Sequence, residues 1–409
     1  MFAGGWTLTD AEQVCADDAL PAEDVFDVLG ELVLKSLIAA DPNLTGATRY
    51  GMLETLRAYA AEQLRAAGER ETLGRRHFDH FLKLAEDAHE RRESTGLNTE
   101  LETTLAHQDN IRAGLSFARR ADPGGMLRFA SAVEPLWLAG NITEGRHWLA
   151  EALSIAPERA QGRVRALNSS AGLAILQQDH QTAHRVIDES LALANEQLDR
   201  RGEAWAWFWL GFLELNGDPP KPDAARRAVE MHKQVGDRVG IGRSLVFLGG
   251  SLTQQPETMT AGQDALRRAV ATAQQLEDEW GEGFARVFLG WAEITLGNHE
   301  LATAHLTHVV ATPALGPVRG TAIEGLARLS LKRDPRRAAR LVGACASVRE
   351  SGGGVPPPWL KRRGEAVRAE AEQALGPREA EHAWHEGRRM STEQAIAYAL
   401  QQRPAATAR

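Results

Sequence analysis

The sequence has few cysteines and no long apolar run. Its 409 residues include 2 cysteines, Cys15 and Cys345, which lie far apart and match no metal-binding spacing. This usage favours a reduced compartment. No apolar run approaches the roughly 18 residues that a membrane-spanning helix needs, and the N-terminus lacks the basic start of a signal peptide. We therefore expect a cytoplasmic protein.

Catalytic and nucleotide-binding motifs are also missing. The chain contains no Gly-x4-Gly-Lys-Ser/Thr loop, no His-Glu-x-x-His, no Gly-x-Ser-x-Gly and no Cys-x-x-Cys. Four histidine pairs have the spacing of one helix face: His77/His80, His180/His184, His305/His308 and His382/His385. A metal ion needs a third and a fourth ligand, which the sequence does not nominate. We expect packing or solvated histidines, no metal, no cofactor and no enzymatic activity.

Basic charge is scarce, above all near the N-terminus. The chain carries 47 Lys/Arg against 55 Asp/Glu, a formal net charge of −8. Residues 1–75 contain 13 Asp/Glu and 6 Lys/Arg, a net charge of −7. Neither this segment nor the remainder has the positive field that attracts a phosphate backbone. We therefore expect no direct nucleic-acid binding by this chain.

The residues that are abundant favour helices. Ala, Leu, Arg and Glu dominate, and unbranched side chains lose little rotamer freedom in a helix. In residues 1–75 a helical pattern, a turn at 41–46, a short strand at 49–53 and a second helical pattern follow one another. This is winged-helix order, and no first helix precedes Phe2. We therefore expect a truncated winged-helix-like unit with a small β-hairpin.

The missing helix has a consequence for packing. The first helical pattern of this unit has one apolar face, made by Phe26, Leu29, Leu32, Val33 and Leu37. In a complete winged helix a first helix would cover part of that face. We expect the face to lack one wall and the segment to be the least stable part of the chain.

A period of about 40 residues marks the middle of the chain. A glycine recurs at intervals of 40, 38, 41 and 39 residues, at Gly162, Gly202, Gly240, Gly281 and Gly320. Each interval holds two helix-length apolar patterns, which is typical of a helical solenoid. Gly290 and Ala302 fall at the small-residue places of the tetratricopeptide pattern, where two helices touch. We predict an all-α, tetratricopeptide-like superhelix.

These patterns divide the chain into five segments. The predicted order is a truncated winged-helix-like segment at 1–75, a helical connector with the first helical hairpins at 76–160, tetratricopeptide-like repeats at 161–333, a C-terminal helical cap at 334–400 and a disordered tail at 401–409. The cap is expected because a repeat array must cover its last apolar face.

Aromatic residues at inner positions of two repeats indicate a groove. Trp205, Phe208 and Phe212 fall at places that face the concave side of a tetratricopeptide array. Phe284 and Trp291 fall at such places in the next repeat but one. An apolar groove for a ligand or a partner helix is one interpretation. Thicker packing between neighbouring repeats is the other.

Two carboxylates stand beside these aromatic residues. Glu214 and Glu293 occupy a position that is usually small or aromatic, so each is expected to be half-buried. A half-buried carboxylate requires a basic partner, for which Arg243 and Arg286 are the nearest choices. Ligand recognition by these carboxylates is the alternative.

Several strings resemble the C-terminal half of LuxR/AfsR-type signal-transduction ATPases of actinobacteria. Phe2-Ala-Gly-Gly-Trp6 resembles the start of the family's winged-helix segment, and residues 49–59 resemble its end. His107-Gln-Asp-Asn-Ile-Arg-Ala113 resembles the start of the helical region, and residues 383–400 resemble the element before a DNA-binding domain. The resemblance covers nearly the whole chain. Family members normally carry an upstream P-loop domain, and many end in a DNA-binding domain; neither is recognisable here.

The resemblance implies a non-catalytic sensor or protein-interaction module of an ATPase-linked bacterial transcriptional regulator, with a ligand or partner in the concave groove. A stand-alone scaffold with protein partners only is the alternative. The expected partners are a nucleotide-binding or DNA-binding domain outside this chain, another protein, or a small-molecule or peptide effector. No membrane contact is expected, and self-association through residues 1–75 is left open.

Overall fold

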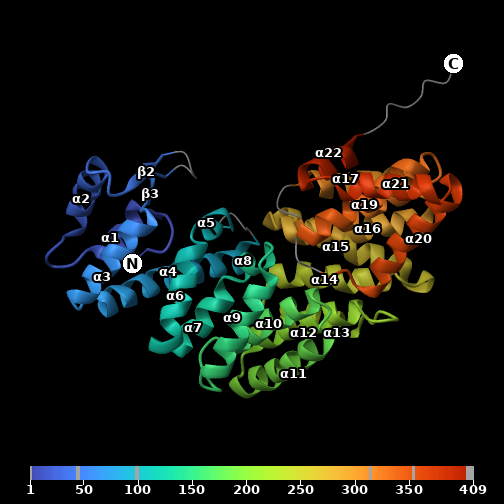
Figure 1. Ribbon diagram of the computed structural model, residues 1–409. Helices are drawn as coiled ribbons and strands as arrows, with labels where there is room; N and C mark the ends of the chain where they lie inside the picture. The colour runs from blue at the N-terminus through green and yellow to red at the C-terminus, as the bar shows by residue number, and fades with distance from the viewer. Residues whose placement is uncertain (1, 43–46, 97–100, 313–315, 352–354, 402–409) are drawn as a thin grey trace. The chain divides into compact units, whose positions relative to one another are not determined.

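The chain is almost entirely helical. The computed structural model describes residues 2–42, 47–96, 101–312, 316–351 and 355–401. Within these residues it contains α-helices α1 to α22, one short 3-10 helix and one three-stranded sheet (Figure 1). The predicted all-α class with a small β-hairpin is confirmed. The predicted tail at 401–409 lies almost wholly outside the described residues.

Two compact units make up the chain, and each is described by itself. The first comprises residues 1–91, 98–136 and 147–166, and the second comprises 92–97, 137–146 and 167–409. The units therefore interleave in sequence instead of following the five predicted segments, whose boundaries stay a prediction. No helix of the described residues is long and apolar enough to cross a membrane.

The first unit begins with the winged-helix-like segment. Its elements are β1 (Trp6–Thr7), α1 (Leu8–Cys15), α2 (Ala22–Leu34), β2 (Ala39–Asp41), β3 (Arg49–Gly51) and α3 (Glu54–Ala66). The antiparallel sheet has the order β1-β3-β2, with Tyr50 opposite both Trp6 and Ala40. The hairpin was expected, but β1 was not, because two residues are too few to show an alternating pattern.

Little of this segment is buried. Helix α2 buries only Val25 and Leu29, and α3 buries no residue at all. Phe26 and Leu37 are 57% and 38% exposed. The predicted apolar face is therefore open at Phe26 and at Leu37, which lies beyond the end of α2, half-buried at Leu32 and Val33, and covered at Leu29.

The rest of the first unit packs around aromatic side chains. The helices that follow α3 are α4 (Arg70–Thr95), α5 (Leu101–Ala106), α6 (Gln108–Ala121), α7 (Pro123–Ala132), α8 (Glu134–Leu138) and α9 (Ile142–Ile155). Phe78 and Phe129 are fully buried, with ring centroids 6.0 Å apart. A Cβ at Gly114 would lie 2.7 Å from Phe129, so a glycine is needed there.

The second unit is an array of helical hairpins. Its helices are α10 (Arg163–Leu176), α11 (His180–Gln197), α12 (Arg200–Leu215), α13 (Asp223–Gln234), α14 (Arg238–Leu252), α15 (Met259–Leu276), α16 (Glu279–Leu296), α17 (His299–Ala311) and α18 (Gly316–Ser330). The even-numbered helices open each repeat. In two repeats the recurring glycine belongs to an N-cap: the Asp199 and Asp237 carboxylates accept hydrogen bonds from Gly202 N and Gly240 N, both at 2.8 Å.

Small residues let the two helices of each hairpin approach closely. A Cβ at Gly211 would lie 2.8 Å from the Ala225 backbone, and one at Gly290 would lie 2.7 Å from Leu306. These contacts join α12 to α13 and α16 to α17. The expected close approach at Gly290 is therefore confirmed, and so are hairpin repeats of about 40 residues.

Four helices follow the array, as predicted. They are α19 (Pro335–Ser351), α20 (Pro358–Leu375), α21 (Pro377–Arg388) and α22 (Thr392–Leu400). Helices α19 and α21 touch backbone to backbone at Gly343 and Gly387: a Cβ at Gly387 would collide with the Arg340 carbonyl oxygen. This close crossing fixes the C-terminal cap.

Candidate functional site: the winged helix and its joint to the helical region

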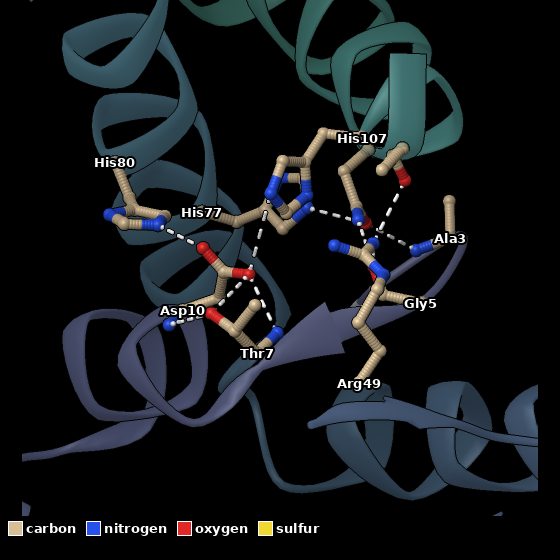
Figure 2. Close-up of polar contacts among 10 residues, drawn as sticks. Ala3, Gly5, Thr7, Asp10, Arg49, His77, His80 and His107 are labelled. Atoms are coloured by element: carbon tan, nitrogen blue, oxygen red, sulfur yellow. Dashed lines mark hydrogen bonds and ion pairs between the residues drawn. The ribbon is translucent and has the colours of Figure 1, made fainter. Parts of the chain in front are cut away.

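A buried carboxylate ties the winged helix to the helices that follow it (Figure 2). Asp10, on α1, is 3% exposed. Its Oδ1 lies 2.8 Å from His80 Nε2 on α4, and its Oδ2 lies 3.8 Å from His107 Nε2. Thr7 N donates to Asp10 Oδ2 at 2.7 Å, which completes the N-terminal cap of α1. The Asp10 side chain thus caps α1 and also links α1 to α4.

Asn110 holds the extended N-terminal segment from the other side. This fully buried side chain of α6 accepts a hydrogen bond from Ala3 N at 2.9 Å and donates to Gly5 O at 3.0 Å. His77 Nε2 lies 3.3 Å from Asn110 Oδ1. The backbone beside β1 is therefore fixed by two directional hydrogen bonds to one amide.

Arg49 links the hairpin to the same place. Its Nη2 donates to Gly5 O at 2.7 Å and to Ala106 O at 2.8 Å, and the residue is 8% exposed. Arg49 belongs to β3, and Ala106 ends α5. We call Asp10, Arg49, His77, His80, His107 and Asn110 the joint.

The protonation of the joint follows from its burial. Burial lowers the pKa of His77 to about 4, so this imidazole is neutral at pH 7. Burial also lowers the pKa of His107, against the pull of Asp10. Burial would raise the pKa of Asp10, but the hydrogen bond with His80, the charge of His107 and the hydrogen bonds with Thr7 outweigh it and leave the pKa below its usual value. The joint therefore has one buried negative charge that histidines surround.

Sequence reasoning did not find the joint. It expected packing or solvated roles for His77 and His80, and both are packed: their rings contact the Phe81 ring, with centroids 4.7 and 4.9 Å apart. It missed Asp10, which lies 70 residues from His80. Among the described residues no group of three or more His, Cys, Asp or Glu side chains is arranged to hold a metal ion.

The outer face of α2 is apolar and acidic. Phe26 and Leu34 are 57% and 86% exposed. Asp24, Asp27 and Glu31 are exposed on the same helix, as is Glu23. Lys35, just after the helix, forms an ion pair with Glu31 at 2.9 Å. Helix α2 is the second of the two helices that precede the hairpin.

The predicted groove residues divide into two groups. Trp205, Phe208 and Phe212 lie in one aromatic cluster, in which the Phe247 ring lies 4.8 Å from the Phe208 ring and 4.7 Å from the Phe212 ring. Phe284 reaches this cluster through Trp280. Phe208, however, is only 2% exposed, which favours packing between repeats over a groove at this residue.

Trp291 lies in a different setting. It is 6% exposed, and the Arg363 guanidinium of α20 covers its ring at 4.6 Å from the centroid. Packing is therefore favoured over an open groove at Trp291 as well. Ligand binding by the partly exposed members, Trp205, Phe212 and Phe284, stays a prediction.

The two carboxylates have partners other than the expected arginines. Glu214 Oε2 accepts from Ala224 N at 3.1 Å and closes the irregular linker before α13. Glu293, 4% exposed, accepts from the side-chain amides of Gln263 at 2.9 Å and Asn298 at 2.7 Å. The predicted pairing with Arg243 or Arg286 is therefore wrong, because both arginines have nearer carboxylates.

Arg243 and Arg286, the two arginines expected to pair with these carboxylates, bind other acidic residues. Arg243 binds both oxygens of Asp278 at 2.9 Å. Arg286 Nε binds Glu282 at 2.7 Å, one turn earlier on its own helix. Both ion pairs join charges that are adjacent in the fold, so they form in preference to a pair with Glu293.

Comparison with known proteins agrees with the N-terminal architecture. Residues 5–65 match the family described as winged helix-turn-helix domain. Three curated relatives, each named a "putative HTH-type transcriptional regulator", come from Mycobacterium bovis and from two strains of Mycobacterium tuberculosis. Each is 29% identical over 258 residues, which is 61% of this chain and 25% of the relative. The chain thus spans about a quarter of the length of the curated relatives it matches.

The family match alters one expectation. Winged helix-turn-helix domains include DNA-binding proteins, so the match makes duplex DNA a candidate ligand. The net negative charge of residues 1–75, however, disfavours binding to a phosphate backbone. The comparison therefore does not support the exclusion of nucleic acid, which stays a prediction.

Proposed function

We propose that this chain is a non-catalytic interaction and sensor module of a cytoplasmic, ATPase-linked transcriptional regulator. In this proposal the tetratricopeptide-like array receives a ligand or protein partner, and the winged helix makes the protein contacts that the signal changes. The likeness to transcriptional regulators and the resemblance to signal-transduction ATPases support the regulatory role. A stand-alone scaffold with protein partners only is the alternative.

The observation that carries the proposal is the joint. Asp10, Asn110 and Arg49 connect all three parts of the winged helix, namely its first helix, its N-terminal strand and its hairpin, to the helical region. Each connection is a directional, buried hydrogen bond, which fixes an orientation better than apolar contact does. A change in the position of α4 or α6 would therefore move the winged helix.

The surface of α2 favours a protein partner over DNA. A helix in the major groove needs donors that reach phosphates and base edges, and Arg and Lys supply most of them. Helix α2 exposes Glu23, Asp24, Asp27 and Glu31 together with Phe26 and Leu34. Carboxylates repel the phosphate backbone, whereas exposed apolar side chains rimmed by charge are typical of protein interfaces.

Duplex DNA is the second candidate, and the helix-turn-helix match favours it. Fluorescence anisotropy of a labelled random-sequence duplex with the full chain separates the two. We expect no binding at physiological salt. The charge-reversed variant Asp24→Lys/Asp27→Lys is the control, and it should gain weak, salt-sensitive binding. If the wild-type chain binds with a steep salt dependence that these substitutions change, the protein-contact role of α2 is wrong.

A further inference from the structure

Helix α20 and the residues before it contact the first helix, or the residues just after it, in five successive repeats of the array. Val355 N donates to Leu176 O at 2.9 Å, at the end of α10. Trp359 Nε1 donates to Asn216 Oδ1 at 3.4 Å, at the end of α12. Further along, Arg363 reaches Gln254, just after α14, and Trp291 on α16, and Glu370 pairs with Arg328 on α18. We call residues 355–371 the strap.

Arg363 is the central contact of the strap. Its guanidinium lies between two indole rings, 4.6 Å from the Trp291 centroid and 5.1 Å from that of Trp359. Its Nη2 also donates to Gln254 Oε1 at 3.0 Å, just past α14. A stacked guanidinium with a fixed acceptor is a specific recognition geometry that Lys does not reproduce.

A buried carboxylate completes the site. Glu324, on α18, is fully buried, forms an ion pair with Arg349 and attracts the charge of Arg363. The backbone of α20 approaches it closely: a Cβ at Gly364 would lie 2.8 Å from Glu324 Oε1. The sequence Trp359-x3-Arg363-Gly364 therefore carries an aromatic ring, a cation and a small residue on one helix.

The contact between strap and array leaves polar groups unsatisfied. Among the buried side-chain atoms of the described residues that have no hydrogen-bond partner are Trp291 Nε1, Arg363 Nη1 and Glu324 Oε1. All three belong to the site just described. Buried polar groups are normally paired, so the strap satisfies this site only in part.

We propose that the C-terminal halves of α12, α14, α16 and α18, with the residues just after α12 and α14, form a docking site for an arginine-bearing helix, that the strap fills this site in cis, and that a partner helix with the same Trp-x3-Arg-Gly chemistry displaces it. The proposal rests on the sensor role above, because it says what the array would sense. The side chains of the strap show which chemistry the docking site accepts, and a partner helix would present the same groups. The acidic Glu324 and the electron-rich face of Trp291 both favour a cation.

The test uses the full chain and a labelled peptide of residues 355–375. In the variant Trp359→Ala/Arg363→Ala the cis strap has lost its two anchors. Anisotropy should show the peptide binding this variant at least about 10-fold more tightly than the wild-type chain, whose own strap competes. Adding Trp291→Ala to the variant should abolish that binding.

The matched control changes exposed residues of the same helix. Lys361 and Glu365 pair with each other on the solvent side, with side chains 69% and 63% exposed. Lys361→Ala/Glu365→Ala should bind the peptide no better than the wild-type chain. A peptide that binds the variant and the wild-type chain equally, or binds neither, overturns the proposal.

If the variant does not fold, amide exchange on the wild-type chain still tests whether the strap can leave the array. A displaceable strap must open without the array, so the amides of α20 should exchange well before those of α16 and α18. If α20 exchanges only together with these helices, the strap is part of the core and the proposal fails. The exchange of α20 does not depend on the outcome of the DNA-binding measurement for α2. A failure of the strap proposal would therefore leave the proposed protein-contact role of α2 unchanged.

Discussion

The winged helix and the helical array are stabilised in different ways. Helix α2 buries 2 of its 13 residues, whereas α14, in the array, buries 10 of its 15. The array packs through glycines that let helices touch, as at Gly211 and Gly290. The winged helix instead depends on a few buried hydrogen bonds at the joint. Apolar packing stabilises without direction, whereas hydrogen bonds fix an orientation and can be broken one at a time.

The same substitution in the two regions gives the largest expected contrast. Gly211→Ala, in the array, places a methyl group 2.8 Å from the Ala225 backbone and should cost about 3 kcal/mol of stability, since the two packed helices have little room to move apart. Gly30→Ala on α2 meets nothing within 4 Å and should stabilise by about 0.5–1 kcal/mol. Denaturant unfolding of both variants measures the difference. Equal effects would mean that the two regions are packed alike.

Removing the amide of the joint should loosen the winged helix alone. Asn110→Ala leaves Ala3 N–H unpaired and takes one donor from Gly5 O, at a cost of about 2–3 kcal/mol. Amide exchange should rise in residues 2–15 and not in the array. Asp109→Ala, at a neighbouring side chain that is 54% exposed, is the matched control and should change little. A uniform rise over the whole chain would show that the joint is not local.

Acid should weaken the joint before it weakens the array. The pKa of His77 is lowered from 6.5 to about 4, so below pH 6.5 the unfolded chain takes up a proton that the folded chain refuses. Stability is thus complete above pH 6.5 and falls as the pH drops towards 4, by roughly 2 kcal/mol between pH 7 and pH 5. His107 acts in the same direction. Exchange in residues 76–82 at both pH values measures the loss.

The variant His77→Gln keeps a donor for Asn110 without a titrating ring. It should remove most of this pH dependence. If the variant responds to acid as strongly as the wild-type chain, another group is responsible for the loss.

The smallest effect is expected on the outer face of α2. Phe26 is 57% exposed, so Phe26→Ser should change stability by less than about 0.5 kcal/mol. Phe208→Ala in the array, where the ring is 2% exposed, should cost about 3 kcal/mol or more. Thermal melts of the two variants make the comparison. A large loss at Phe26 would mean that the face is covered, for example by a second copy of the chain.

Sequence reasoning succeeded where structure is local. The repeats could be predicted because several helix starts carry an Asp cap, as at Asp199 and Gly202, and because close packing demands a glycine at a fixed place. The order of helices and hairpin at the N-terminus followed from apolar periodicity and turn residues. These signals lie within a few residues of one another.

Contacts between distant residues could not be predicted. Asp10 meets His80, and Arg363 meets Trp291, only because the fold brings separate helices together. The wrong partners for Glu293 have the same origin, since Arg243 reaches Asp278 in the next repeat instead. Nothing in the local pattern says which of several carboxylates an arginine will bind.

Amide exchange across the whole chain, in a monomer at low concentration, tests the central contrast most directly. We predict that residues 22–66, which hold α2 and α3, open well before the array at 163–330, and that residues 2–15, which the joint holds, have protection between these limits. Equal protection of residues 22–66 and the array would contradict it. The winged helix would then be stabilised by a packed core of its own and not by the joint.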